Sequence, residues 1–253
     1  MKRVFGLIGF PLEHSWSKRF FNQKFLDEAI VDAVYENFPL QDLSSFRHLI
    51  LKNERIAGLN VTIPHKQEII KHLDDLDQTA EKVGAVNTIK VKRNEGGIKL
   101  TGFNTDVVGF ESSLQSNNIS LDHKALILGS GGAFKAVGFV LEKYNCPYLV
   151  VSRNPKGKNC ISYNQITKQV ISEHRLIINT TPLGMFPNIE SLPQIPYNSL
   201  TPDHVLFDLV YNPTETSFLK KGKEVGSKTI NGLEMLELQA LESWRIWNEY
   251  PLG

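Results

Sequence analysis

A strand, a glycine turn and a helix follow one another without interruption in the second half of this 253-residue chain. The apolar run KALILG (124–129) predicts a buried strand, and GGAFKAVGFVLEKYN (131–145) predicts a helix. PYLVVSR (147–153) predicts a second strand, and a helical crossover places it parallel to the first. The unit therefore requires a parallel sheet.

Two further runs, RLIINTT (175–181) and HVLFDLVY (204–211), are almost continuously apolar. Parallel strands that are covered by helices on both faces have runs of this kind. The predicted fold class is α/β, with a doubly wound, Rossmann-type sheet in this half of the chain.

The residues before 104 predict a separate α/β block. Its pattern alternates strands and helices and then ends in a β-hairpin with the turn Asn94-Glu95-Gly96-Gly97. The expected strands are 4–9, 34–40 and 58–63, the helices are 15–30, 42–53 and 66–73, and the hairpin is 85–105. A helix over 106–117 opens the second block, and a helix over 232–248 closes it, with Trp244 and Trp247 on an apolar stripe expected to be core.

Composition narrows the functional classes. The net charge of +1 gives no electrostatic case for nucleic acid or an anionic membrane, and no apolar run reaches the length of a membrane span. The N-terminus lacks the long apolar region of a signal peptide. Cys146 and Cys160 fit no metal-binding or CxxC pattern, so we expect free thiols, no metal and a cytoplasmic location.

The glycine turn is a candidate phosphate site. Gly129 and Gly131 supply the first two glycines of the dinucleotide fingerprint, and Phe134 stands at the third position. Such a turn lets backbone approach a pyrophosphate at a helix N-terminus. A P-loop is excluded because no Gly-Lys-Ser/Thr follows at its spacing. A glycine-rich turn without a ligand is the alternative.

The next predicted strand indicates which dinucleotide would bind. An NAD-binding fold places an acidic residue at its end, whereas this chain has Ser152 and Arg153. An Arg can pair with a 2′-phosphate and lie along an adenine face. The sequence therefore favours NADP over NAD, and a solvent-exposed Arg is the alternative.

Polar residues gather after two predicted strands of the first block. Ser15 and Ser17 are two residues apart, so in extended backbone their hydroxyls point the same way, toward a carboxylate or polyol; an N-cap is the alternative. In LNVTIPHK, Asn60 and Thr62 share one face of a half-buried strand. Lys66 follows at a predicted helix start, where its charge opposes the helix dipole. A catalytic role would explain why a lysine stands at this electrostatically unfavourable position, although lysines with only a surface role are commoner than catalytic ones.

Two more polar residues are candidates. Asn87 lies in an otherwise apolar strand, so its amide either bonds backbone or meets a ligand. Asp106 precedes a helical pattern, where it either caps the helix or takes part in a site.

The chain resembles the shikimate dehydrogenase family. The motifs HSWS, NVTIPHK, GAVNT, GFNTD, GSGGA, NTTPLGM, DLVY and LQA occur in the family's order and approximate spacing, from about residue 5 to 245. The resemblance implies NADP-linked reduction of 3-dehydroshikimate to shikimate in aromatic amino acid biosynthesis. It also implies a substrate-binding domain over 1–103, an NADP-binding domain over 104–235, a helix over 236–253 that returns to the first domain, and an active site in the cleft between the domains. It leaves a monomer and a homodimer open.

The resemblance also implies roles for individual residues. Lys66 and Asp106 are similar to the catalytic pair, and the implied substrate ligands are Ser15, Ser17, Asn60, Thr62, Asn87, Tyr211 and Gln239. The implied cofactor residues are Gly129, Ser130, Gly131, Gly132, Ala133, Ser152, Arg153, Leu209, Gly232 and Met235. The chain departs from the family at Trp16, Lys18 and Ser152, where a smaller apolar residue, Pro and Asn are common.

Three other readings stay open. One is an NAD-using quinate/shikimate dehydrogenase, although Ser17 favours shikimate over quinate. Another is a non-catalytic nucleotide-binding regulator, which would have little need of both Lys66 and Asp106. The third is a lyase that forms a Schiff base through Lys66 and needs no NADP.

Overall fold

The computed structural model describes residues 2–13 and 15–249. His14 of the HSWS motif and residues 250–253 of the expected C-terminal helix lie outside the described residues. The chain forms two compact units, Met1–Thr105 with Ala240–Gly253, and Asp106–Gln239. The chain passes between them within α4 (Thr105–Ser116) and α8 (Leu233–Asn248).

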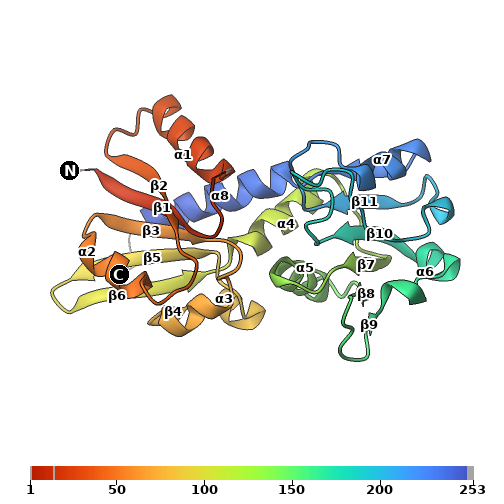
Figure 1. The fold of residues 1–253 in the computed structure, drawn as a ribbon, viewed down its shortest axis with the longest axis horizontal. Coiled ribbons are helices and arrows are strands. Elements are labelled where there is room, and N and C mark those ends of the chain that lie inside the picture. Colours follow the sequence, from red (N-terminus) through yellow and green to blue (C-terminus); the bar gives the residue numbers. More distant parts are fainter. Residues whose placement is uncertain (1, 14, 250–253) are drawn as a thin grey trace. The chain divides into compact units, whose positions relative to one another are not determined.

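The first unit contains a six-stranded mixed sheet in the order β2-β1-β3-β5-β6-β4 (Figure 1). The parallel strands are β1 (Arg3–Gly9), β2 (Ala33–Pro39) and β3 (Ile56–Val61). The predicted hairpin is confirmed as β5 (Thr88–Asn94) and β6 (Gly97–Phe103), and Gly97 has a φ of +113° in its turn. A short β4 (Asp75–Leu76) pairs with β6.

Both faces of this sheet are covered. One face packs against α2 (Phe46–Lys52), a 3₁₀ turn η1 (Glu68–His72) and α3 (Gln78–Val83). The other packs against α1 (Trp16–Asp27) and the last turns of α8 through an aromatic cluster that contains Phe5, Phe21 and Trp247. Trp247 is confirmed as core, and Trp244 packs against the same cluster.

Two expectations for LNVTIPHK are wrong. The strand is not half-buried, because Leu59, Asn60 and Val61 are all buried between the two covered faces. It also ends at Val61, and the helix expected over 66–73 is only the five-residue η1. A proline and a short apolar repeat do not support a full α-helix here.

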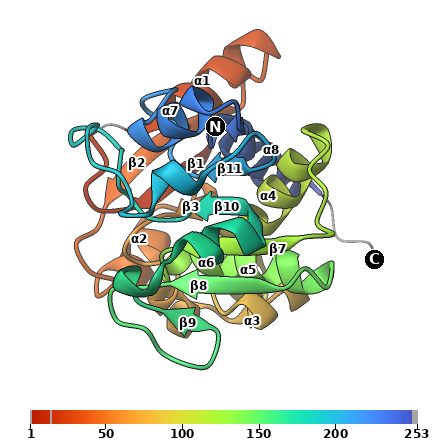
Figure 2. The ribbon, with the colours of Figure 1, turned by 90° about the vertical axis from the view of Figure 1, so that its right-hand side faces the viewer.

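The second unit contains a six-stranded, all-parallel sheet, and its strands can be followed in Figure 2. Its order is β12-β11-β10-β7-β8-β9, which is the doubly wound order 3-2-1-4-5-6 read from the other edge. The strands are β7 (Lys124–Leu128), β8 (Tyr148–Val151), β9 (Cys160–Ile161), β10 (His174–Asn179), β11 (Val205–Asp208) and β12 (Lys228–Ile230). The α/β fold class is confirmed.

Alternating side chains of these strands enter two cores. Leu126, Ile177 and Leu206 enter a core that includes residues of α6 (Lys168–Glu173) and α7 (Ser217–Glu224). On the other face, Phe207 meets Phe110 of α4 with ring centroids 5.2 Å apart. α5 (Gly132–Lys143) follows β7, and the short helices η2 (Tyr163–Gln165) and η3 (Tyr197–Ser199) lie in connecting loops.

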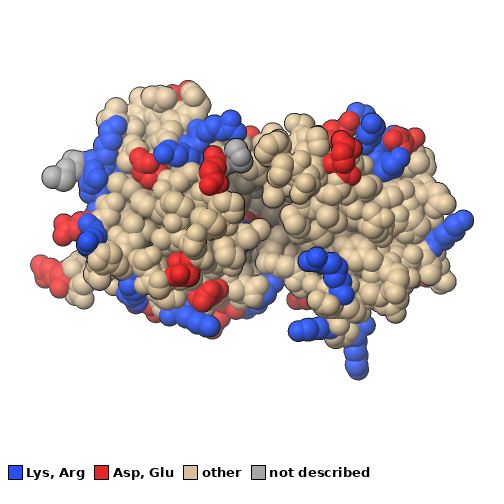
Figure 3. Space-filling view, in the orientation of Figure 1, with Lys and Arg blue, Asp and Glu red and all other residues tan. Residues whose placement is uncertain are grey.

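Acidic and basic side chains are interspersed on the face drawn in Figure 3, with basic ones around the β8–β9 loop. Among residues 2–13 and 15–249, no helix has the length and apolar character needed to cross a membrane. Cys146 and Cys160 are both free thiols, as expected.

Candidate functional site

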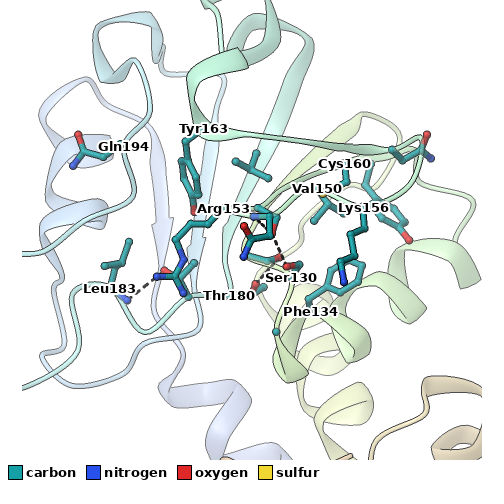
Figure 4. Close-up of a pocket in the computed structure, with 18 of the residues that line it drawn as sticks. Ser130, Phe134, Val150, Arg153, Lys156, Cys160, Tyr163, Thr180, Leu183 and Gln194 are labelled. Atoms are coloured by element: carbon teal, nitrogen blue, oxygen red, sulfur yellow. Dashed lines mark hydrogen bonds between the residues drawn. The ribbon is translucent and has the colours of Figure 1, made fainter.

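A pocket of about 1030 Å³ opens in the second unit at the carboxyl ends of β7, β8 and β10 (Figure 4). β7 and β10 are the strands at which the chain order of the sheet reverses, the point where doubly wound sheets bind ligands. The pocket wall comes from the glycine turn, the residues after β8 and the 180–183 loop after β10. The topology therefore places the candidate cofactor site here.

The glycine turn presents bare backbone. Gly129 has a φ of +110°, and a Cβ there would lie 2.8 Å from Thr180 Oγ1 and from Thr181 Cγ2. At Gly131 and Gly132 a Cβ would meet no atom within 4 Å, so the turn leaves open space beside the start of α5. Gly131 caps that helix without a side-chain hydrogen bond. The arrangement fits a pyrophosphate, which would use the N–H groups of the first turn.

The turn is joined to the end of β8 by two hydroxyls. Ser130 and Ser152 lie 2.8 Å apart, Oγ to Oγ, and Ser152 Oγ also accepts the Asn154 N–H. Gly129, Ser130, Gly131, Ser152 and Arg153 all line the pocket, whereas Gly132 and Ala133, the first two residues of α5, are not among its lining residues.

The charge of the pocket wall is positive. Arg153 and Lys156 are exposed on the β8–β9 loop, and none of the lining residues is Asp or Glu. In Figure 4, Arg153 is directed toward Thr180 and Leu183, and Lys156 toward Phe134. A carboxylate that would accept hydrogen bonds from a ribose diol is absent from the lining residues, and cations suited to a phosphate monoester are present.

Sequence reasoning missed several lining residues. They are Phe134, Tyr148, Lys156, Tyr163, Thr180, Thr181, Leu183 and Gln194. Lys156 could have been found as the second cation of the loop that carries Arg153. Thr180 and Thr181 are the last residues of the strand predicted over 175–181, and in the structure they follow β10, which ends at Asn179. Their place at the carboxyl end of a parallel strand could have marked them as ligand-facing.

Leu209, Gly232 and Met235 do not line this pocket. Leu209 and Gly232 meet closely, because a Cβ on Gly232 would lie 2.2 Å from the Leu209 carbonyl oxygen. Met235 is buried on α8, and its carbonyl oxygen would lie 2.5 Å from a Cβ on Gly109. Leu209 and Gly232 therefore lie together just after β11, and Met235 lies against Gly109 of α4.

Three more candidates belong to the second unit. Tyr211 is half-buried after β11, and Gln239 is buried on α8, where its amide donates to the Leu236 carbonyl. Asp106 is buried and is the second residue of α4, so the N-cap alternative is wrong: the helix begins at Thr105. A carboxylate in the first turn is stabilised by the helix dipole.

In the first unit, the argument that placed Ser15 and Ser17 side by side on extended backbone is wrong. Ser15 is the N-cap of α1 and Ser17 lies in its first turn. The Ser15 side chain makes no capping hydrogen bond to α1, and its buried Oγ has no hydrogen-bond partner among the described residues. Ser17 interacts with the phenol of Tyr35. Complete burial raises the pKa of Tyr35 well above its ordinary value.

Asn60 is held by protein groups on every side. Its Oδ1 accepts the Tyr35 hydroxyl at 2.8 Å, and its Nδ2 reaches Ser243 Oγ at 2.9 Å, Thr88 Oγ1 at 3.2 Å and the Asn87 carbonyl at 3.2 Å. These partners occupy the amide, so Asn60 connects β3 to β5 and α8 rather than offering free groups to a ligand.

Asn87 organises the start of α4. Its Oδ1 accepts the Thr105 N–H at 2.7 Å, and its Nδ2 donates to Thr105 Oγ1 at 3.0 Å. Of the two alternatives for this buried amide, a bond to backbone is therefore present. It holds the residue that immediately precedes Asp106.

Lys66 lies on a turn fixed at both ends. Its carbonyl accepts the Val86 N–H at 2.7 Å, and Thr62 N–H donates to the Ile8 carbonyl at 2.9 Å. The buried His65 between them bonds the Leu40 carbonyl through Nε2 at 2.7 Å. The Lys66 side chain itself is half-buried.

Comparison with known proteins gives a consistent result. A family model described as the shikimate dehydrogenase substrate binding domain matches residues 7–89. A shikimate dehydrogenase (NADP(+)) of Clostridium beijerinckii is 40% identical over 257 residues, which cover 98% of this chain and 93% of that protein.

Solved structures are similar over nearly the whole chain. A shikimate dehydrogenase in complex with NADP+ has a TM-score of 0.85 and 36% identity, over 98% of this chain and 90% of that one. A quinate dehydrogenase from Corynebacterium glutamicum in complex with NAD has the same TM-score with 27% identity, over 98% and 94%. Fold similarity alone therefore does not separate the two activities.

Proposed function

Because the chain belongs to the shikimate dehydrogenase family, we propose that it catalyses the reversible, NADP-linked reduction of 3-dehydroshikimate to shikimate. This reaction places it in the biosynthesis of aromatic amino acids. The observation that carries the proposal is the pocket at the end of β7, with its bare glycine turn and two cations.

The cofactor proposal follows from the pocket wall. The backbone at Gly131 and Gly132 would bind the pyrophosphate, and Arg153 with Lys156 would pair with the 2′-phosphate. A carboxylate at this position would instead favour the free ribose diol of NAD. NADPH, when bound, supplies the hydride for the ketone. We assign Leu209, Gly232 and Met235 to the nicotinamide end.

The substrate proposal rests on the first unit and on residues after β11 and on α8. The buried Ser15 Oγ, which lacks a partner among the described residues, would bind the substrate carboxylate together with Ser17 and Tyr211. Thr62, Asn87 and Gln239 would hold ring hydroxyls. Asn60, whose amide is already occupied, would support them through Tyr35 and Ser243.

In the proposed mechanism, Lys66 transfers the proton and Asp106 assists it. The Lys66 ammonium donates a proton to the oxygen that becomes the alcohol, and Asp106 orients it. In the oxidative direction the Lys66 amine accepts that proton again. General acid catalysis of this kind contributes roughly 10²–10⁴-fold to a rate. Free thiols and the use of NADP support a cytoplasmic location.

The quinate/shikimate alternative is favoured by the NAD-bound neighbour of equal TM-score. The test is reduced-nicotinamide absorbance on mixing the purified protein with shikimate or quinate, each with NADP or NAD. We expect rapid NADPH formation from shikimate. NADH formation, or equal turnover of quinate, would reject the cofactor or substrate proposal and retain the family. No signal from folded protein that still binds NADP would favour a regulator.

A further inference from the structure

A carboxylate that belongs to none of the groups above is buried at the end of β11. Asp208 is fully buried, and its Oδ1 accepts Asn179 Nδ2 at 2.9 Å and Val210 N–H at 3.0 Å. Its Oδ2 accepts the Thr216 hydroxyl at 2.6 Å. No salt bridge reaches it from the residues that the structure describes. A buried charge held only by neutral donors is costly, so it requires an explanation.

The carboxylate fixes the orientation of a neighbouring amide. Asn179 and Asp208 are register partners at the ends of β10 and β11. An ionised carboxylate only accepts hydrogen bonds, so it requires the Nδ2 group of Asn179 to face it. Asn179 Oδ1 is thereby directed to Thr181, where it accepts the hydroxyl at 2.6 Å and the N–H at 3.0 Å. Nδ2 also donates to the Leu183 carbonyl at 3.3 Å.

The segment held by Asn179 is the pocket wall. Thr181, Pro182 and Leu183 line the pocket, and Thr181 Cγ2 packs against the space that a Cβ would need at Gly129. A reversed amide at Asn179 would present Nδ2 to the Thr181 N–H, where two donors would meet. The loop would then leave its position beside the glycine turn.

We propose that Asp208 is a positioning residue for the cofactor: its carboxylate sets the amide of Asn179 and thereby holds the 180–183 loop in the conformation that binds NADP. This inference rests on the proposed binding of NADP in this pocket. Asp208 is not among the residues that line the pocket, and its hydrogen bonds to described residues go to Asn179, Val210 and Thr216.

Protonation of Asp208 should remove this constraint on the orientation of the Asn179 amide. Burial raises the pKa of Asp208 to about 6, against the lowering effect of its hydrogen bonds. The charge of Asp208 also acts on Tyr197 of η3, whose pKa is raised by burial and by Asp208. The groups that donate to Asp208, on Asn179 of β10, on Val210 after β11 and on Thr216 before α7, are neutral. A protonated Asp208 can donate to Asn179 Oδ1 and so permit the reversed amide.

The test measures the dissociation constant of NADPH by fluorescence titration, between pH 5 and pH 8, for wild type and Asp208→Asn. The variant mimics the protonated carboxyl at every pH. We expect it to bind roughly tenfold more weakly than wild type at pH 7.5, the effect of about one charge-assisted hydrogen bond. The ratio should approach one below about pH 6. The phosphate monoester of NADPH also titrates near pH 6, but it cancels in this ratio.

Ile177→Val is the matched control. It removes one methylene from the hydrophobic core on the same strand as Asn179 and leaves the hydrogen bonds of Asp208 and Asn179 in place. We expect it to bind NADPH as wild type does. A ratio that stays constant with pH would assign Asp208 a merely structural role and overturn the inference, as would equal binding by Asp208→Asn at pH 7.5. Wild type that fails to bind NADPH would instead reject the proposed function.

Discussion

Trp247 lies directly against the backbone of Gly58, so that a Cβ built on Gly58 would come within 2.3 Å of the indole Nε1. That indole N–H donates to the Ile89 carbonyl at 3.0 Å, and the ring stacks on Phe5 with centroids 4.9 Å apart. The glycine is therefore the place where the last helix docks on β3 of the first unit. Its small size is a packing requirement.

Gly58→Ala should destabilise the protein by about 1–3 kcal/mol, the usual cost of overpacking a filled core. The ring cannot yield easily because its N–H is hydrogen-bonded and the ring packs against both Phe5 and Phe21. Urea unfolding would measure the change. Gly96→Ala is the control: its Cβ would meet only the flexible Asn94 Oδ1, at 3.3 Å, and should cost far less. Equal effects would contradict the docking role.

Tyr35→Phe should also destabilise, by about 1–3 kcal/mol, because Asn60 Oδ1 would be left buried without a donor. Ser17 would lose its phenol partner, so the KM for shikimate should rise as well. Denaturant unfolding and steady-state kinetics test the two effects. The more exposed Tyr144→Phe is the comparison, and similar losses in both variants would argue against a special role for Tyr35.

The sequence predicted the longer elements of both units, and in the second unit it also predicted the ligand-binding edge of the sheet. Continuous apolar runs at 124–129, 175–181 and 204–211 identify parallel strands, and the glycine turn marks their ligand-binding end. The short elements β4, α3, β9, α6, α7 and β12 were missed, because two to eight residues carry too little periodicity. Their caps, such as Asp77 before α3 and Thr216 before α7, are the signals that sequence reading could have used.

The polar residues show where a motif is insufficient. Asn60 and Thr62 have strand spacing, but spacing could not reveal that Tyr35, Thr88 and Ser243 already occupy the Asn60 amide. These partners come from three other elements, one of them 183 residues away in sequence. Hydrogen-bond satisfaction of a buried side chain is a tertiary property, so it cannot be read from a local pattern.

Lys66→Ala should lower turnover by at least about 10²-fold, the lower range of general acid catalysis, because it removes the proposed proton donor. NADPH binding should be retained, since the cofactor pocket lies in the second unit. Steady-state kinetics and fluorescence titration separate the two effects. Lys71→Ala, at an exposed lysine of η1, is the control. Turnover of Lys66→Ala within threefold of wild type would exclude Lys66 as the donor.

Removing the cations of the β8–β9 loop should change cofactor preference. Arg153→Ala should raise the KM for NADP by about 10–100-fold, in keeping with the loss of a charge-assisted phosphate contact, and leave the KM for NAD nearly unchanged. Lys156→Ala should act in the same direction more weakly. Lys158→Ala, in the same loop but outside the pocket wall, should have little effect. Parallel changes for NADP and NAD would argue against a 2′-phosphate site.

Asp208→Asn should show opposite effects on stability and on cofactor binding. Because the folded protein raises the pKa of Asp208 from 3.8 to about 6, it binds a proton there more tightly than the unfolded chain does. The resulting stabilisation is complete below about pH 4 and is lost as the pH rises through 6. The free energy of unfolding of the wild type is therefore lower at pH 7.5 than at pH 4 by on the order of 3 kcal/mol through this group, whereas the variant lacks this loss.

Urea unfolding at both pH values should show the free energy of unfolding of the variant rising relative to wild type as the pH rises, while its NADPH affinity relative to wild type falls. A gain in stability with a loss of binding is expected of a charge retained for function. A stability difference independent of pH would show that folding does not raise the pKa of Asp208.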